Sequence, residues 1–120
     1  MLMAELNRSQ GFSVRLATTP EEIEKTQRLR YDVFAGEMGA QVHTIKPGVE
    51  SDDFDPYCEH LLVEELETGR IVASTRLLRK EAAKAIGRFY SESEFTAGFI
   101  ASLDGEVVEL GRTCVHVDFR

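Results

Sequence analysis

The chain has 120 residues, the size of a single domain, and a formal net charge of −7 at neutral pH. Hydrophobic residues account for 42% and charged residues for 29% of the chain, as in ordinary globular proteins. The acidic balance argues against nucleic-acid binding, and the apolar runs are too short to cross a bilayer. Glu5 and Arg8 interrupt the N-terminal apolar residues, so no signal peptide is predicted.

Cysteine and histidine usage indicates a reducing compartment and no metal centre. Cys58 and Cys114 cannot form a disulfide framework and are interpreted as packing residues. His43, His60 and His116 lack the close spacing of a zinc site. We therefore expect a cytoplasmic protein without a metal or redox cofactor.

The first elements in chain order are a strand and a long helix. Residues 12–17 alternate apolar and polar side chains, as a half-buried strand does. Thr19 and Glu22 form a capping box at the start of a helix that is expected to cover residues 20–38. Gly39 is expected to end this helix.

The remaining elements predict the fold class. They follow in the order long loop, strand, turn, strand, short helices and strand, over residues 40–57, 60–66, 67–70, 71–78, 81–103 and 106–115. This order predicts an α/β domain with a mixed, mainly antiparallel sheet flanked by helices. The last strand is expected in a central position, where it would need a further partner.

Charged side chains recur inside segments that otherwise have the composition of a protein core. Charged groups are rarely buried unless they are paired. The pattern therefore predicts either a buried network of ion pairs or the lining of a polar pocket. The four clusters are residues 28–34, 50–55, 74–78 and 108–112.

Arg30 lies on the apolar side of the predicted helix, one turn before Phe34. Its stem could pack while the guanidinium reaches water, or the guanidinium could be buried against carboxylates of the other clusters. Glu50, Asp52 and Asp55 could supply those carboxylates, solvate the loop or face a cationic amine. Their spacing is not that of a calcium-binding loop.

Glu109 and Arg112 are three residues apart and would point to opposite faces of a regular strand. Gly111 between them is a plausible position for a β-bulge, which would bring both side chains to one face. The two residues then form a structural salt bridge, or Glu109 orients or deprotonates an amine.

Two consecutive stretches carry opposite charge. Both could be solvated faces, or the basic stretch could meet a phosphate, an acidic protein or a membrane surface. The acids of residues 50–67 are Glu50, Asp52, Asp53, Asp55, Glu59, Glu64, Glu65 and Glu67. The basic residues of 70–88 are Arg70, Arg76, Arg79, Lys80, Lys84 and Arg88, against the acid Glu81.

Six segments in order carry a resemblance to a known family. They are RLRYDVFAGEM (28–38), DDFDPY (52–57), HLLV (60–63), ASTRLL (73–78), FYSESEF (89–95) and ELGRTCVH (109–116). Over residues 15–120 the chain resembles the first half of a GNAT-superfamily N-acyltransferase. It is similar to the ornithine–acyl carrier protein N-acyltransferases of ornithine-lipid synthesis and to their relatives, the acyl-homoserine-lactone synthases.

The resemblance implies which residues form the site. Glu109 would be the catalytic residue, as general base or orienter of the amine. Arg30, Arg76 and Arg112 would organise the acidic loop and the substrate carboxylate. The remaining site residues would be Phe34, Glu50, Asp52 and Asp55.

The details of the resemblance favour the ornithine-lipid branch. The chain has no tryptophan, which the lactone synthases usually carry after the helix. Val117 departs from the ornithine-lipid branch, which often has proline there. The loop, helix and fifth strand that hold the acyl donor in GNAT enzymes would lie beyond Arg120. Residues 1–120 are therefore expected to be the N-terminal portion of one acyltransferase domain, truncated after the fourth strand.

The resemblance also implies a reaction and its partners. A fatty acyl group would move from an acyl carrier protein thioester, or a CoA thioester, to the α-amine of ornithine or a similar amino acid. The alternatives are a synthase of acyl-homoserine lactones and a truncated, non-catalytic remnant. Peripheral contact with the anionic inner face of the membrane is a further expectation.

Overall fold

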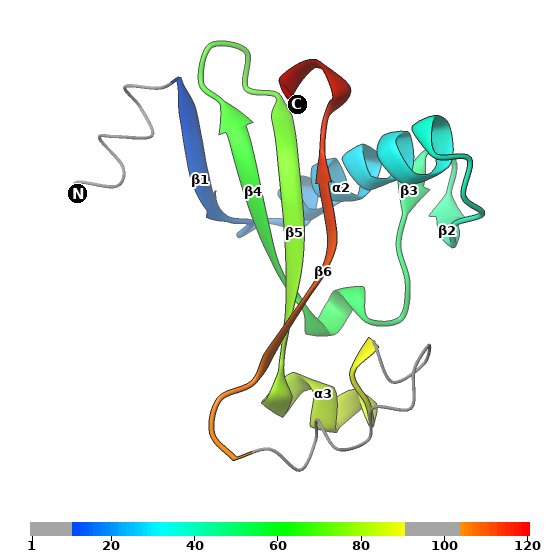
Figure 1. The fold of residues 1–120 in the computed structure, drawn as a ribbon, viewed down its shortest axis with the longest axis vertical. Helices are drawn as coiled ribbons and strands as arrows, with labels where there is room; N and C mark the ends of the chain where they lie inside the picture. Colours follow the sequence, from blue (N-terminus) through cyan, green and yellow to red (C-terminus); the bar gives the residue numbers. More distant parts are fainter. Residues whose placement is uncertain (1–10, 91–103) are drawn as a thin grey trace.

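The computed structural model describes residues 11–90 and 104–120. Figure 1 shows a sheet with a long helix beside its upper half and a short helix below it. The helical elements are α2 (Pro20–Arg30), η1 (Tyr31–Glu37), η2 (Asp55–Tyr57), α3 (Lys80–Ile86) and η5 (Val117–Phe119). The strands are β1 (Phe12–Leu16), β2 (Thr44–Lys46), β3 (Val49–Glu50), β4 (Glu59–Glu65), β5 (Ile71–Arg79) and β6 (Val108–Val115).

The four longer strands form one antiparallel sheet in the order β1-β4-β5-β6. This confirms the predicted α/β fold with an antiparallel sheet. Within the described residues β6 is an edge strand paired with β5, so the further partner that the sequence analysis expects for this strand is not among them.

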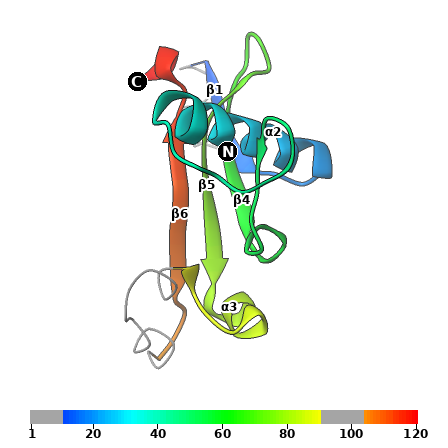
Figure 2. The same cartoon turned by 90° about the vertical axis from the view of Figure 1, so that its right-hand side faces the viewer.

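One face of the sheet is covered by α2. Figure 2 shows α2 crossing the upper part of the sheet, where it contacts β4, β5 and β6. Along β5 the residues Val72, Ser74, Arg76 and Leu78 are buried and alternate with partly exposed ones. The covered face therefore includes a buried arginine, which positions the site described below.

The long helical segment begins and ends as predicted. Thr19 Oγ1 accepts a hydrogen bond from the Glu22 N–H at 3.2 Å. The Glu22 carboxylate accepts from the Thr18 N–H at 2.9 Å, so the capping box is displaced by one residue. Beyond α2 the segment continues as the wider π-helical turns of η1 to Glu37, a change in winding that was not predicted.

Residues 40–57, expected to be one long loop, contain a small hairpin. β2 and β3 pair across a turn at Pro47 and Gly48, and Gly48 has a φ of 76°, which favours glycine. β3 packs against α2 and buries Val49 and Glu50. The prediction was wrong because strands of two and three residues are too short to show an alternating pattern.

The second half follows the predicted order with shifts of a few residues. The strand expected from Glu106 begins at Val108. α3 is one of the short helices expected over 81–103, and Gly87 ends it. Residues 91–103 lie outside the described residues. No helix in the described part of the chain is both long and apolar enough to cross a membrane.

Among the described residues, two groups of apolar side chains pack together in the core. Phe54, Leu78, Ala83 and Phe89 form one group, and Leu29, Val33 and Cys114 form the other. Both cysteines are free. Burial raises the pKa of both thiols, to about 11 for Cys58. Both therefore remain protonated at neutral pH.

Candidate active site

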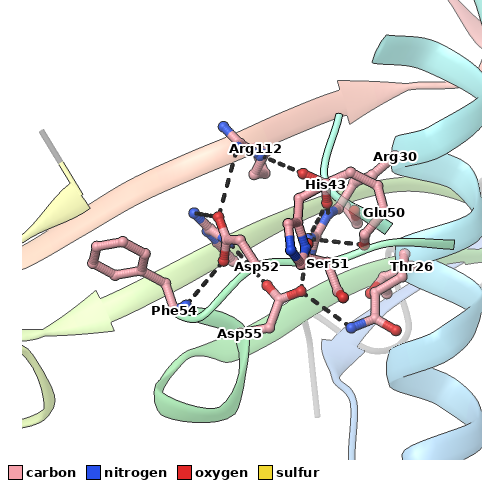
Figure 3. Close-up of polar contacts among 12 residues, drawn as sticks. Thr26, Arg30, His43, Glu50, Ser51, Asp52, Phe54, Asp55 and Arg112 are labelled. Atoms are coloured by element: carbon pink, nitrogen blue, oxygen red, sulfur yellow. Dashed lines mark hydrogen bonds and ion pairs between the residues drawn. The ribbon is translucent and has the colours of Figure 1, made fainter. Parts of the chain in front are cut away.

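Six charged side chains close into a ring of alternating sign between α2, the loop after β3 and the sheet (Figure 3). Each guanidinium contacts two carboxylates, and each carboxylate contacts two guanidinium groups. We call it the charge ring, and its members in order are Arg30, Glu50, Arg112, Asp52, Arg76 and Asp55. Three arginines balance three carboxylates, so its formal charge is zero. The predicted network of buried ion pairs is confirmed.

Arg30 forms the buried side of the charge ring. Its side chain is 1% exposed, so the guanidinium does not reach water. Nε donates to Glu50 Oε2 at 2.7 Å, and Nη2 donates to Asp55 Oδ2 at 2.8 Å. Gln27, one turn earlier on α2, donates to the same Asp55 oxygen at 3.1 Å. α2 is thereby fastened to the acidic segment.

Arg76 joins the two aspartates from β5. Its Nη1 donates to Asp52 Oδ1 at 2.7 Å and to Asp55 Oδ1 at 2.9 Å, and its Nη2 donates to Asp52 Oδ2 at 3.0 Å. Asp52 thus receives two parallel bonds, the geometry that makes arginine a strong partner of carboxylates. The Phe54 N–H also donates to Asp52, at 3.0 Å. The guanidinium lies 5.3 Å from the centroid of the Tyr90 ring.

A β-bulge brings Arg112 to the charge ring. Ser74 of β5 pairs with Cys114 of β6, and Arg76 pairs with Gly111. Between these two pairs β5 has one residue and β6 has two, so the additional residue of β6 forms the bulge. The predicted bulge is confirmed. The left-handed residue is Arg112, with a φ of 51°, and not Gly111. The contacts of the Arg112 side chain compensate for this uncommon backbone conformation.

Arg112 and Asp52 form the exposed side of the charge ring. Arg112 Nε donates to Glu50 Oε1 at 2.8 Å, while its Nη2 lies 3.5 Å from Asp52 Oδ2. The side chains of Arg112 and Asp52 are 25% and 17% exposed. The longest contact of the ring is therefore also the most accessible one.

Glu109 lies next to the charge ring, and Tyr90 links the two. The Tyr90 N–H donates to Glu109 Oε1 at 2.7 Å. Arg112 Nη1 donates to the Tyr90 hydroxyl at 3.2 Å, and its guanidinium lies 4.8 Å from the ring centroid. Glu109 and Arg112 thus contact the same residue, Glu109 through the Tyr90 backbone and Arg112 through the Tyr90 side chain, and Glu109 is partly exposed.

Three residues of this region were missed by the sequence analysis. Gln27, Phe54 and Tyr90 each contact the charge ring. A signal existed only for Gln27, which lies one helical turn before Arg30. Phe34 packs with the apolar group of α2 and β6, and no described contact joins it to the ring.

Ion pairing outweighs burial in setting the protonation of the charge ring. Burial alone would raise the pKa of Asp55, but Arg30 and Arg76 together hold it below its ordinary value. Burial likewise opposes the charge of Arg76 and Arg112. Asp52 and Asp55 nevertheless raise the pKa of Arg76, and the hydrogen bonds with Tyr90 and Glu50 raise that of Arg112. Burial lowers the pKa of His60, whose Nε2–H donates to the Asp55 carbonyl at 3.1 Å.

A hollow of about 550 Å³ borders the charge ring. We call it the acidic hollow, and it is lined by Gln27, Ile45, Ser51, Asp52, Asp53, Asp55, Pro56, Tyr57 and Ile86. Three carboxylates and no lysine or arginine are among these lining residues, which suits a cationic amine. No group of three or more metal-ligating side chains is arranged around a metal position within residues 11–90 and 104–120.

The family of the chain follows from its sequence match and its fold. Residues 29–120 match the acetyltransferase (GNAT) domain family. The chain belongs to the GNAT acetyltransferase family. It is 40% identical over 117 residues to an L-ornithine N(alpha)-acyltransferase of Rhodobacter capsulatus, covering 92% of this chain and 45% of that protein. It is 39% identical over 126 residues to an L-ornithine N(alpha)-acyltransferase of Rhizobium meliloti, and the match covers 96% of this chain and 42% of that protein.

Two solved structures share the fold. The AHL synthase LasI aligns with a TM-score of 0.64 and 19% identity, over 88% of this chain and 53% of that one. TofI, in a ternary complex with an inhibitor and MTA, aligns with a TM-score of 0.57 and 24% identity, over 87% of this chain and 56% of that one. These likenesses confirm the expected GNAT-like fold. The GNAT chain described here spans less than half the length of the curated relatives it matches.

Proposed function

We propose that this protein is an N-acyltransferase that moves a fatty acyl group from acyl carrier protein to the α-amine of ornithine in lipid biosynthesis. The observation that carries the proposal is about 40% identity, over most of the chain, to relatives named L-ornithine N(alpha)-acyltransferase. The fold alone would not carry it, because one fold hosts many activities. The reaction would take place in the cytoplasm, with peripheral contact at the anionic membrane face and without a metal or redox cofactor.

Glu109 is the proposed general base. Its carboxylate would take a proton from the α-ammonium of ornithine, directly or through water, which frees the nitrogen lone pair. The amine nitrogen would then attack the thioester carbonyl carbon, forming the C–N bond as the C–S bond breaks. The departing thiolate would take up one proton. The products are N-acylornithine and the free thiol of the carrier.

The charge ring is proposed to position the amino-acid substrate. Arg112 on its exposed side is suited to the substrate carboxylate, as a guanidinium binds a carboxylate with two bonds. The acidic hollow offers three carboxylates to the side-chain ammonium of ornithine. Arg30, Arg76, Glu50, Asp52 and Asp55 would keep these two regions in a constant arrangement, with Phe34 packed behind them.

The test is a Glu109→Gln variant of the protein expressed from its whole reading frame. Isotope-labelled ornithine and an acyl carrier protein thioester serve as substrates, and N-acylornithine is quantified. Removing a general base should lower kcat by about 10²–10⁴-fold. Glu106→Gln, the same change at an exposed residue just before β6, should change kcat less than about twofold.

The products separate this proposal from its alternatives. Wild-type turnover by Glu109→Gln would remove Glu109 from the reaction. Formation of an acyl-homoserine lactone, and not of N-acylornithine, would identify a signal synthase. A folded wild-type protein that forms neither product would be a non-catalytic remnant.

A further inference from the structure

Tyr90 contacts the proposed general base and the proposed carboxylate-binding residue from its two ends. Its backbone N–H donates to Glu109 Oε1 at 2.7 Å. At the other end of the residue, the hydroxyl accepts from Arg112 Nη1 at 3.2 Å, and the guanidinium lies 4.8 Å from the ring centroid. The length of one tyrosine therefore relates the position of Arg112 to that of Glu109.

Packing holds the Tyr90 ring in place. The rings of Tyr90 and Phe54 meet edge to face with their centroids 5.4 Å apart, and Phe54 is 4% exposed. The Arg76 guanidinium lies 5.3 Å from the Tyr90 centroid and is itself held by two aspartates of the charge ring. The Tyr90 hydroxyl is thus presented to Arg112 from a ring that is fixed on the side of the core.

Arg112 keeps hydrogen-bond donors for a substrate. Its Nε donates to Glu50, its Nη1 to the Tyr90 hydroxyl, and its Nη2 lies 3.5 Å from Asp52 Oδ2. Each Nη nitrogen carries two hydrogens, so both can also donate to a carboxylate. The bonds from Nε and Nη1 hold the planar guanidinium at two of its nitrogens. They therefore set the direction in which its remaining N–H groups point.

Ornithine has two amines, and only the α-amine adjoins the carboxylate. The α-nitrogen and the carboxylate carbon are bonded to the same atom, which places them about 2.5 Å apart. The δ-nitrogen lies three carbons farther along the molecule. With the carboxylate bound to a guanidinium, a base at one constant distance reaches one of the two amines and not the other.

We infer that Tyr90 is a positioning residue that directs acylation to the amine adjoining the carboxylate. The inference rests on the proposed function, which assigns proton transfer to Glu109 and the substrate carboxylate to Arg112. The Tyr90 hydroxyl acts through Arg112 and does not touch the reacting atoms. Its removal should leave Glu109 in place, because the backbone N–H remains, and should let the carboxylate-binding guanidinium shift.

The decisive variant is Tyr90→Phe, in the protein expressed from its whole reading frame. It keeps the ring and the backbone N–H and removes only the hydroxyl. With an acyl carrier protein thioester as donor, Nα- and Nδ-acylornithine are separated by chromatography and quantified by mass spectrometry. The Nδ share of the product and the KM for ornithine should each rise by about three- to tenfold, while kcat changes less than about twofold.

The matched control is Tyr31→Phe, the same change at the start of η1. The Tyr31 hydroxyl has no hydrogen-bond partner among the described residues. This variant should change the Nδ share and the KM for ornithine by less than about 1.5-fold.

Putrescine, which is ornithine without its carboxylate, provides a second measurement. The wild-type enzyme should have a higher kcat/KM for ornithine than for putrescine, since only ornithine can use Arg112. Tyr90→Phe should lower this preference by about three- to tenfold. Partial misfolding would lower kcat/KM for both substrates equally and would leave their ratio unchanged, so the ratio reports positioning.

An unchanged Nδ share together with an unchanged substrate ratio in Tyr90→Phe would overturn the inference and leave the proposed function standing. Equal changes in Tyr90→Phe and Tyr31→Phe would also overturn it, because the effect would then not pass through Arg112. A wild-type protein that acylates neither nitrogen of ornithine would overturn the proposed function, and this inference with it.

Discussion

At the scale of single residues, Arg30 shows how a charge can occupy a position in the core. Its guanidinium contacts Glu50 and Asp55 in a region from which water is excluded. Such an arrangement gains little over a well-packed apolar one, because desolvation offsets most of the attraction. Loss of one member is costly, however, since the remaining charges stay buried without their partner.

This predicts a large difference between two arginines of the same helix. Arg30→Ala should lower the free energy of unfolding by about 3–5 kcal/mol, because it leaves Glu50 and Asp55 short of a partner. Arg28→Ala removes an arginine that is 51% exposed and pairs with Glu24, and should cost less than about 1 kcal/mol. Urea unfolding of both variants measures the difference. Equal small losses would mean that the buried pairs contribute no more than surface ones.

At the scale of elements, the bulge in β6 controls where two side chains point. A regular strand would turn Glu109 and Arg112 to opposite faces. The additional residue in β6 places both around Tyr90. The bulge depends on Arg112 in the left-handed region, where glycine would be the easier residue. We conclude that the Arg112 side chain stabilises this conformation through Glu50 and Tyr90.

The two glycines next to these elements should respond differently to alanine. Gly48 has a φ of 76°, so Gly48→Ala should cost about 1–2 kcal/mol. Gly111 has no positive φ, and the nearest atom to an added Cβ is Arg76 Nε at 4.0 Å. Gly111→Ala should therefore change stability by less than about 1 kcal/mol. Thermal unfolding compares them, and a greater loss in Gly111→Ala would mean that the bulge requires glycine at that position.

At the scale of the whole molecule, acid should weaken the link between the charge ring and the sheet. His60 and Asp55 have pKa values below their ordinary ones in the folded chain. Each therefore binds a proton more readily when the chain is unfolded. The stability that such a group contributes is fully present when the pH is above its pKa in the unfolded chain. It is lost as the pH falls toward its pKa in the folded chain.

The pH dependence of unfolding tests this in two ranges. As pH falls below about 6.5, the ordinary value for histidine, the wild-type free energy of unfolding should decrease because of His60. His60→Gln keeps a donor for the Asp55 carbonyl but cannot titrate, so its curve should be flatter there. A further loss below about 3.8 should remain in both proteins, because it comes from Asp55. Identical slopes near pH 6 would exclude His60 as the titrating group.

The sequence by itself determined the features that depend on neighbouring residues. The start of α2 at Thr19, the order of the strands and the bulge before Arg112 each follow from chemistry within a few positions. The presence of charges in core segments likewise indicated a paired network. These features are local, so no knowledge of distant segments was needed. The hairpin at Gly48 is the exception, because its strands are too short to be recognised.

Only the tertiary structure decided which charges meet. Arg30 and Arg112 share Glu50 although they lie 20 and 62 positions from it in the chain. Tyr90 joins the site because the segment after α3 returns to β6, a contact that no local pattern indicates. Ion pairs have no periodicity in sequence, and any arginine could have matched any carboxylate. The packing of α2 on one face of the sheet selected a single closed arrangement of the six side chains.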